Sequence, residues 1–191
     1  MIQIEKVLED IPDKRENKGT TSLKFKKDLI EFYKHKNNGT IVELGTHMGY
    51  STKVLSYLFE DVITFDNNYE KTCLAKAFNQ KRDNITYFTE DAYKYHWWET
   101  SDQINAVFID TVHVYDNVIM DIENCLKINN ECHIIFDDYG MFADIKKAVD
   151  EYVENKKLEF IKFIGESAGS DCRPGKILKD WEGVICKINQ K

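Results

Sequence analysis

The chain has 191 residues, and its 26 Lys and Arg against 33 Asp and Glu give a formal net charge of −7. This length suits one α/β domain with its own core, and the acidic balance disfavours nucleic acid because a phosphate backbone would be repelled. No stretch approaches the ~20 apolar residues of a membrane span, and the first residues lack a signal-peptide pattern, so we expect a cytoplasmic protein without a membrane partner. The five cysteines are scattered without zinc spacing, and we expect them to be reduced thiols.

Strand and helix patterns alternate after residue 20, which is typical of a parallel sheet with crossover helices. Short apolar runs predict strands at 40–44, 62–65, 85–88, 104–109 and 133–136. Amphipathic periodicity predicts helices at about 22–36, 51–60, 70–81, 118–126 and 142–155. Ser51 is the expected N-cap of the second helix.

The last two apolar runs, 158–164 and 183–188, are joined by a Gly-containing loop in which no helix fits. Two strands joined in this way favour an antiparallel hairpin added to an otherwise parallel sheet. We therefore predict a single doubly wound α/β domain with a mostly parallel seven-stranded sheet. Its expected parts are an N-terminal helical segment (1–39), a cofactor-binding core (40–150) and a closing β-hairpin (151–191). The 165–180 loop is expected to be mobile and to border an acceptor pocket.

Acidic residues stand at the ends of four predicted strands, namely Glu43, Asp66, Asp110 and the pair Asp137-Asp138. The carboxyl ends of parallel strands line the ligand crevice of an open sheet, so these side chains should converge on one rim. A single acidic residue after a strand is often only a helix cap or a turn former. Their repetition favours a functional rim.

The segment IVELGTHMGYST joins a strand to a helix through Gly45 and Gly49, which lets the backbone approach a ligand closely. It lacks the GxGxxG pattern, and this disfavours an NAD-dependent oxidoreductase. Asp66 lies 21 residues after Gly45, near the ~20-residue offset at which a carboxylate accepts hydrogen bonds from a ribose diol. Both features suit an adenosine ligand.

These segments resemble the motifs of class I S-adenosylmethionine-dependent methyltransferases. VELGTHMGYST resembles their first motif, VITFDNN the ribose-binding strand end and TEDAY the adenine-side acidic turn. FIDTVHVYDNVIMDI and IIFDDY resemble the fourth and fifth motifs, so that the match covers about residues 40–150. The FIDxxHxY and DDY elements are similar to the small-molecule branch, which includes metal-dependent sugar and catechol O-methyltransferases. The resemblance implies a Rossmann-like methyltransferase fold and S-adenosylmethionine as cofactor.

The resemblance also implies roles for individual residues. Glu43 and Gly45 would lie by the methionine moiety, Asp66 would hold the ribose and Asp91 would neighbour the adenine. The expected cofactor-binding residues, all taken from these motifs, are Glu43, Gly45, Thr46, Gly49, Ser51, Asp66, Asn67, Asp91, Ala92 and Asp110. The chain departs from some relatives at Val112, where they carry an acidic base.

Asp110, Asp137 and Asp138 are the candidate metal ligands. Three carboxylates close together repel one another, so such a cluster needs a cation or a proton. Ligation by oxygen alone favours Mg²⁺, Mn²⁺ or Ca²⁺ over zinc.

His113 and Asp110 are the candidate catalytic residues. His113 follows Asp110 by three residues, and an imidazole there could take a proton from an acceptor hydroxyl. The simpler interpretation is that His113 only holds the backbone turn.

Three hypotheses remain open from the sequence. The first is metal-assisted O-methylation of a small-molecule or glycan hydroxyl, with a homo-oligomer able to supply a missing pocket wall. The second is metal-independent methyl transfer with His113 or Asp110 as base. The third is a non-catalytic cofactor-binding subunit.

Two further features have both a functional and a structural interpretation. His47, inside the glycine turn, is expected to face solvent, with cofactor contact as the alternative. The aromatic cluster at 93–98 could stack on adenine or on a sugar face, while core packing explains at least one of its tryptophans equally well.

Overall fold

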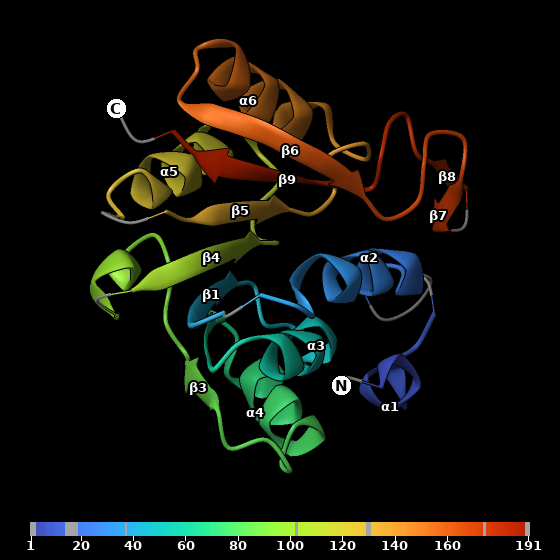
Figure 1. Cartoon of the computed structure of the whole chain (residues 1–191), viewed down its shortest axis with the longest axis vertical. Coiled ribbons are helices and arrows are strands. Elements are labelled where there is room, and N and C mark those ends of the chain that lie inside the picture. Colours follow the sequence, from blue (N-terminus) through green and yellow to red (C-terminus); the bar gives the residue numbers. More distant parts are fainter. Residues whose placement is uncertain are drawn as a thin grey trace.

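The computed structural model describes residues 3–13, 19–36, 38–101, 103–128, 131–173 and 175–189, with backbone only at 172–173. Its main feature is a seven-stranded sheet with the strand order β3-β2-β1-β4-β5-β9-β6 (Figure 1). The five strands from β3 to β5 pair in parallel, and β9 pairs antiparallel with both β5 and β6. The strands are β1 (Thr40–Leu44), β2 (Asp61–Phe65), β3 (Ile85–Phe88), β4 (Ile104–Ile109), β5 (His133–Phe136), β6 (Leu158–Ile164) and β9 (Gly183–Ile188).

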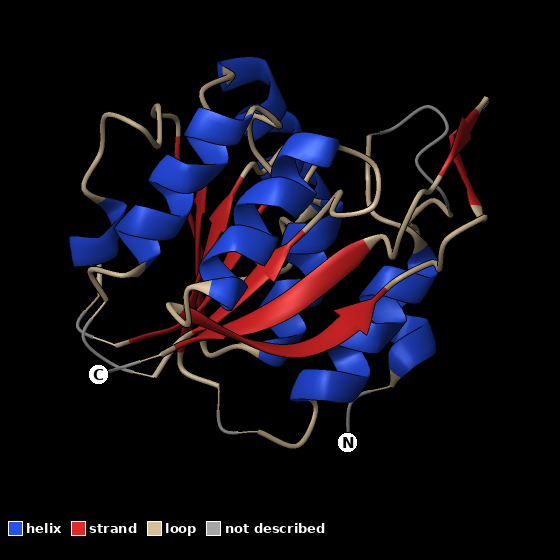
Figure 2. Ribbon diagram, turned by 90° about the horizontal axis from the view of Figure 1, so that it is seen from above, coloured by secondary structure: helices blue, strands red, loops and turns tan. Residues whose placement is uncertain are grey.

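Helices cover both faces of this sheet (Figure 2). Side chains alternate along β4, so that Val107 and Ile109 pack in one core with α5 and α6, while Ala106 and Phe108 pack in another with α1, α2 and α3. A strand buried on both faces is apolar along its buried length, which is why residues 106–109 form a continuous apolar run, while Asn105 near the start of β4 is only half-buried. The helices are α1 (Ile4–Leu8), α2 (Leu23–Tyr33), α3 (Tyr50–Leu58), α4 (Tyr69–Phe78), the 3₁₀ helix η1 (Trp97–Glu99), α5 (Tyr115–Cys125) and α6 (Ala143–Glu154).

The strand order reverses between β1 and β4, which is the point where ligands bind in folds of this kind. Gly45 follows β1 there with φ +102°, and a Cβ on it would lie 2.0 Å from the carbonyl oxygen of Asp110 at the end of β4. Only glycine lets the two strand ends approach this closely. The first motif and the fourth motif therefore meet at the switch point.

The doubly wound fold with its antiparallel C-terminal strands is confirmed, but three details differ from the expectation. Ser51 lies inside α3, whose N-cap is Gly49 with φ 75°, so the chain enters this helix through a left-handed glycine rather than a serine cap. The boundary expected between residues 150 and 151 falls within α6. The 165–180 loop contains a small hairpin of β7 (Asp171–Arg173) and β8 (Lys176–Ile177), which stands away from the main sheet in both views (Figures 1 and 2).

Cys73, Cys125, Cys132 and Cys186 are free thiols. Within the described part of the chain, every helix is too short or too polar to cross a bilayer.

Candidate functional site

Cavities open where β1 to β5 end, along the rim on which the acidic residues were expected. One cavity of about 270 Å³ lies over the ends of β1, β2, β3 and β4. We call it the cofactor cavity; its lining is Gly45, His47, Phe65, Asp66, Asn67, Glu90, Asp91, Ala92, Tyr93, Asp110, Thr111 and Val112. Six of the residues expected to bind the cofactor are in this lining.

Asp66 is held rigidly at the edge of the cofactor cavity. Its Oδ2 accepts a hydrogen bond of 2.7 Å from the backbone N–H of His47, and its Oδ1 accepts one of 2.8 Å from the backbone N–H of Asn68. Each carboxylate oxygen has a further lone pair. The carboxylate is therefore fixed in position and can still accept hydrogen bonds from a ligand diol.

Asp91 lies across the cavity from the first motif, in the turn after β3. The ammonium group of Lys94 lies 3.0 Å from its carboxylate, and the Tyr93 backbone N–H donates to it at 3.1 Å. Both donors lower the pKa of Asp91, and Lys94 has the larger effect. The turn thus presents an ionised carboxylate at neutral pH.

Glu43 does not line this cavity. It is completely buried beneath the floor, where its Oε2 accepts hydrogen bonds of 2.6 Å from the hydroxyls of Thr52 and Thr64. Its pKa is raised to about 8, mainly by burial; the hydrogen bonds from Thr52 and Thr64 oppose the shift, and the neighbouring Asp110 and Asp66 add to it. Glu43 therefore ties β1 to β2 and α3 and is largely protonated at neutral pH.

A second cavity, of about 200 Å³, lies beside the first over the ends of β4 and β5. We call it the acceptor cavity; it is lined by Gly19, Thr20, His47, Asp110, Thr111, His113, Asp137 and Asp138. A narrow cleft lies between the glycine turn and the N-terminal segment. Its lining is Gly19, Thr20, Gly45, Thr46, His47, Met48, Tyr50, Ser51 and Asp110. His47 and Asp110 border all three spaces.

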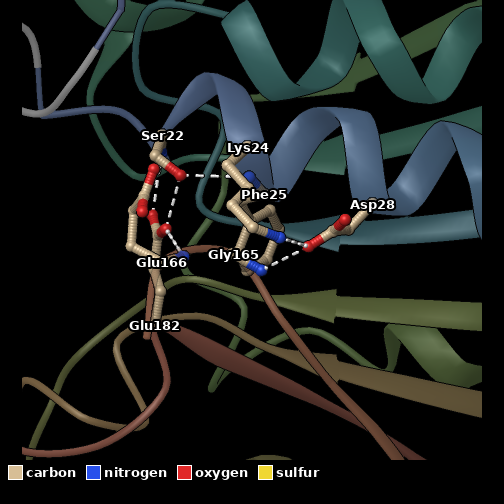
Figure 3. Close-up of polar contacts among 7 residues, drawn as sticks. All are labelled: Ser22, Lys24, Phe25, Asp28, Gly165, Glu166 and Glu182. Atoms are coloured by element: carbon tan, nitrogen blue, oxygen red, sulfur yellow. Dashed lines mark hydrogen bonds and ion pairs between the residues drawn. The ribbon is translucent and has the colours of Figure 1, made fainter. Parts of the chain in front are cut away.

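The N-terminal wall of the acceptor cavity is anchored by two buried charged side chains. Lys26 is fully buried, and its ammonium group donates to the hydroxyls of Thr20 and Thr21 and to the Thr21 carbonyl oxygen. Glu182 accepts hydrogen bonds from the backbone N–H and the hydroxyl of Ser22 (Figure 3). Since buried charges are tolerated only when they are hydrogen-bonded, this segment is held in one place.

Asp110, His113 and Asp138 form a compact group in the acceptor cavity, and one ligand atom from each lies within 4.8 Å of the others. The Nε2 atom of His113 is 3.6 Å from Asp110 Oδ1 and 3.3 Å from Asp138 Oδ2. The imidazole stacks on the ring of Phe142 with centroids 4.4 Å apart. The arrangement can hold a cation, or it can orient His113 as a base.

Two residues of these cavities adopt a strained backbone. His47 has φ 45° and Asp138 has φ 60°, a left-handed conformation that is uncommon outside glycine. Such strain concentrates at functional sites because the surrounding structure has to impose it. It places the side chains of both residues at the cavity rim.

The structure brings most of the expected residues together, with some differences. Asp137 lines the acceptor cavity but is not in the compact ligand group, where His113 takes its place. Glu43 and Gly49 line none of these cavities; a Cβ on Gly49 would instead lie 2.6 Å from the side chain of Asn79 on the other side. None of the described residues of the 165–180 loop lines them either.

His47 was expected to face solvent, and its position in the structure differs from this expectation. It is half-buried, its Nδ1 is enclosed, and burial followed by the charge of Lys71 lowers its pKa. The aromatic cluster divides: Tyr93 lines the cofactor cavity, while Trp97 is a fully buried core residue.

Sequence reasoning missed Thr20 and Thr111 on the cavity walls, together with Asp121 below them. Asp121 carried a signal, because it is a carboxylate on the otherwise apolar face of α5. No pattern marked Thr20.

Comparisons with known proteins identify the family of the chain. A family profile for a methyltransferase domain matches residues 42–139, which include the cofactor cavity and the Asp137-Asp138 pair. A search of curated proteins returns no match.

Solved structures show the same fold at low sequence identity. An O-methyltransferase from Bacillus cereus in complex with S-adenosylhomocysteine aligns with a TM-score of 0.69 at 18% identity, covering 98% of this chain and 90% of that one. An N-methyltransferase from Bradyrhizobium japonicum in complex with the same compound aligns with a TM-score of 0.66 at 12% identity, covering 95% and 89%. The family profile spans more than half of the residues, and the chain belongs to the methyltransferase family that this domain defines.

Proposed function

We propose that the chain is an S-adenosylmethionine-dependent methyltransferase that transfers the methyl group to a hydroxyl of a small molecule or glycan with the help of a divalent cation. The observation that carries the proposal is the position of Asp110. It lines both the cofactor cavity and the acceptor cavity, and it also belongs to the group Asp110–His113–Asp138. One residue therefore connects cofactor, acceptor and candidate metal.

The cofactor cavity fits an adenosine with a charged tail. Asp66, fixed by two backbone N–H groups, would accept hydrogen bonds from the ribose hydroxyls. The Asp91–Tyr93 turn would border the adenine, and the narrow cleft at Thr46 and Ser51 would take the methionine end. S-adenosylmethionine supplies an electrophilic methyl group on a sulfonium sulfur.

The acceptor cavity fits a divalent cation. Two carboxylates and an imidazole meet there, and Asp138 is only 1% exposed, so its negative charge calls for a cation or a proton. Asp110, Asp138 and His113 would hold the ion, with Asp137 beside them. A bound Mg²⁺ or Mn²⁺ would lower the pKa of an acceptor hydroxyl and orient it.

The lining also favours a neutral polyhydroxyl acceptor. The described residues around the acceptor cavity supply carboxylates, imidazoles and hydroxyls but no lysine or arginine. Away from the proposed cation, a phosphate or carboxylate on the acceptor would meet the like charge of these carboxylates. Sugar hydroxyls, by contrast, can donate to carboxylates and accept from Thr20 or His47.

A second candidate keeps methyl transfer without a metal. The 3.3 Å contact between His113 Nε2 and Asp138 Oδ2 resembles a base oriented by a carboxylate, and the stacked Phe142 would limit the rotation of the ring. In that case His113 takes the acceptor proton directly.

The test is methyl transfer from labelled S-adenosylmethionine to a panel of sugars and catechols. Activity that disappears in EDTA and returns with Mg²⁺ supports the metal mechanism, and full activity in EDTA would leave His113 as base. Asp138→Asn should abolish activity, whereas Asp116→Asn, an exposed carboxylate in the first turn of α5, should not change it. Binding of S-adenosylhomocysteine without turnover on any acceptor would favour a cofactor-binding subunit instead.

A further inference from the structure

Asp121 is a buried carboxyl group that the mechanism above does not use. It lies on α5 with 0% of its surface exposed, between the core residues Val118 and Cys125. A carboxyl group in such surroundings loses its hydration, and the loss is tolerable only when hydrogen bonds replace the water. Asp121 therefore needs an explanation beyond packing.

Its hydrogen bonds lead to the cofactor cavity. Asp121 Oδ2 accepts a hydrogen bond of 2.8 Å from the hydroxyl of Thr111 and one of 3.3 Å from the hydroxyl of Tyr93. The two hydroxyl oxygens are 3.0 Å apart. Thr111 and Tyr93 both line the cofactor cavity, while Asp121 lies below it.

The two partners come from different parts of the chain. Tyr93 belongs to the turn that follows β3, and Thr111 is the second residue after β4. These segments form two sides of the cavity in which the adenosine is proposed to bind. One carboxyl group on a helix thus links both sides from beneath.

We propose that Asp121 is a positioning residue for the cofactor, which holds the Tyr93 and Thr111 hydroxyls together and so fixes the shape of the part of the cofactor cavity that these two residues line. The inference rests on the proposed S-adenosylmethionine binding. An ionised Asp121 accepts both hydroxyl protons more strongly than a neutral carboxyl group does, because charged acceptors form the stronger hydrogen bonds. The fit of the cavity should therefore depend on its ionisation.

Burial raises the pKa of Asp121 to about 7, against the opposing hydrogen bonds from Thr111 and Tyr93. The titratable groups that face it are Tyr93, whose pKa burial raises to about 12, and Cys125, whose pKa is also raised by burial. Both stay neutral between pH 6 and 8. Within this network, only Asp121 changes its charge in that range.

The experiment measures the affinity of the intact protein for S-adenosylhomocysteine by calorimetry at pH 6 and pH 8. Asp121→Asn should weaken binding at pH 8 by roughly tenfold, the effect of one or two hydrogen bonds to a charged group. Wild-type affinity should fall as the pH is lowered, and this fall should be smaller in the Asn variant. His47 in this cavity and Glu43 beneath it are present in both proteins, so their contributions to the pH dependence cancel in the comparison.

The matched control is Glu123→Gln, the same chemical change on the same helix. Glu123 accepts a hydrogen bond from the hydroxyl of Tyr152, but neither residue lines the cofactor cavity. Glu123→Gln should leave the affinity unchanged within about twofold, a difference of roughly 0.4 kcal/mol. Unchanged affinity in Asp121→Asn would overturn the proposal.

A second pair covers the case in which Asp121→Asn fails to fold. Tyr93→Phe removes one donor to Asp121 and should weaken binding, whereas Tyr152→Phe removes the corresponding donor to Glu123 and should not. Equal affinities of the two Phe variants would contradict the proposal. A wild-type protein that does not bind S-adenosylhomocysteine at all would instead contradict the proposed cofactor.

Discussion

Ser22 and Glu182 are 160 positions apart in the sequence, yet the Glu182 carboxylate accepts a hydrogen bond of 2.8 Å from the Ser22 backbone N–H and one of 2.5 Å from its hydroxyl (Figure 3). The same carboxylate accepts the Glu166 backbone N–H at 2.9 Å, and the Glu182 carbonyl oxygen accepts the N–H of Tyr139, the residue after Asp138. Glu182 thus links the N-terminal wall of the acceptor cavity to the strand end that carries its carboxylates.

Removing this carboxylate should destabilise the fold. Glu182→Ala leaves the buried N–H of Ser22 and the N–H of Glu166 without their acceptor, and we expect the free energy of unfolding in urea to fall by about 2 to 4 kcal/mol. Glu159→Ala, an exposed glutamate on β6, should change it by less than about 0.5 kcal/mol. Similar losses in the two variants would show that the linkage contributes little.

Glu43 should make stability depend on pH. Its folded-state pKa of about 8 lies above the ordinary value of 4.5, so between these values the folded chain keeps a proton that the unfolded chain releases. The contribution of Glu43 to the free energy of unfolding should therefore be greatest at and below pH 4.5. As the pH rises from 4.5 to 8, this contribution should decrease by at most ~1.4 kcal/mol per pH unit.

Glu43→Gln should remove this slope, because the amide does not titrate and can still accept from Thr52 and Thr64. Glu60→Gln, at an exposed position after α3, should retain it. Urea unfolding at half-unit pH steps checks the difference between the variants. Parallel profiles for wild type and Glu43→Gln would mean that Glu43 is ionised in the folded protein.

Asp66 should contribute to the binding of S-adenosylmethionine or its demethylated product, and NAD should not bind. Asp66→Ala removes the proposed acceptor for the ribose hydroxyls, and we expect S-adenosylhomocysteine to bind ~1.5 to 3 kcal/mol more weakly in calorimetry. Asp61→Ala, at the exposed start of β2, is the control that should bind normally. Micromolar binding of NAD with no response to S-adenosylhomocysteine would rule out the proposed cofactor.

The candidate metal site should depend more on His113 and Asp138 than on Asp137. We expect Asp138→Asn and His113→Asn each to weaken the binding of Mn²⁺ by at least about tenfold in a calorimetric titration, and Asp137→Asn to have the smaller effect. Equal losses for Asp137→Asn and Asp138→Asn, with His113→Asn unaffected, would restore the all-carboxylate set expected from the sequence.

Much of the fold was predictable because it depends on local patterns. Continuous apolar runs such as 106–109 indicate strands buried on both faces, and acidic residues at strand ends lie on one rim because parallel strands end on the same side of a sheet. The antiparallel pairing of 158–164 with 183–188 followed from the missing helix between them.

Only the tertiary structure decided how individual side chains share the rim. Asp137 and Asp138 are adjacent in the sequence, and the left-handed backbone at Asp138, imposed by its surroundings, brings this carboxylate into contact with His113. Glu43 was expected at the rim like Asp66, but it lies within β1, one residue before the strand ends, and is fully buried, whereas Asp66 follows the last residue of β2. Contacts between distant segments, such as Asp121 with Tyr93 and Ser22 with Glu182, leave no periodic trace in the sequence, since they depend on how separate elements pack and not on the spacing within any one of them.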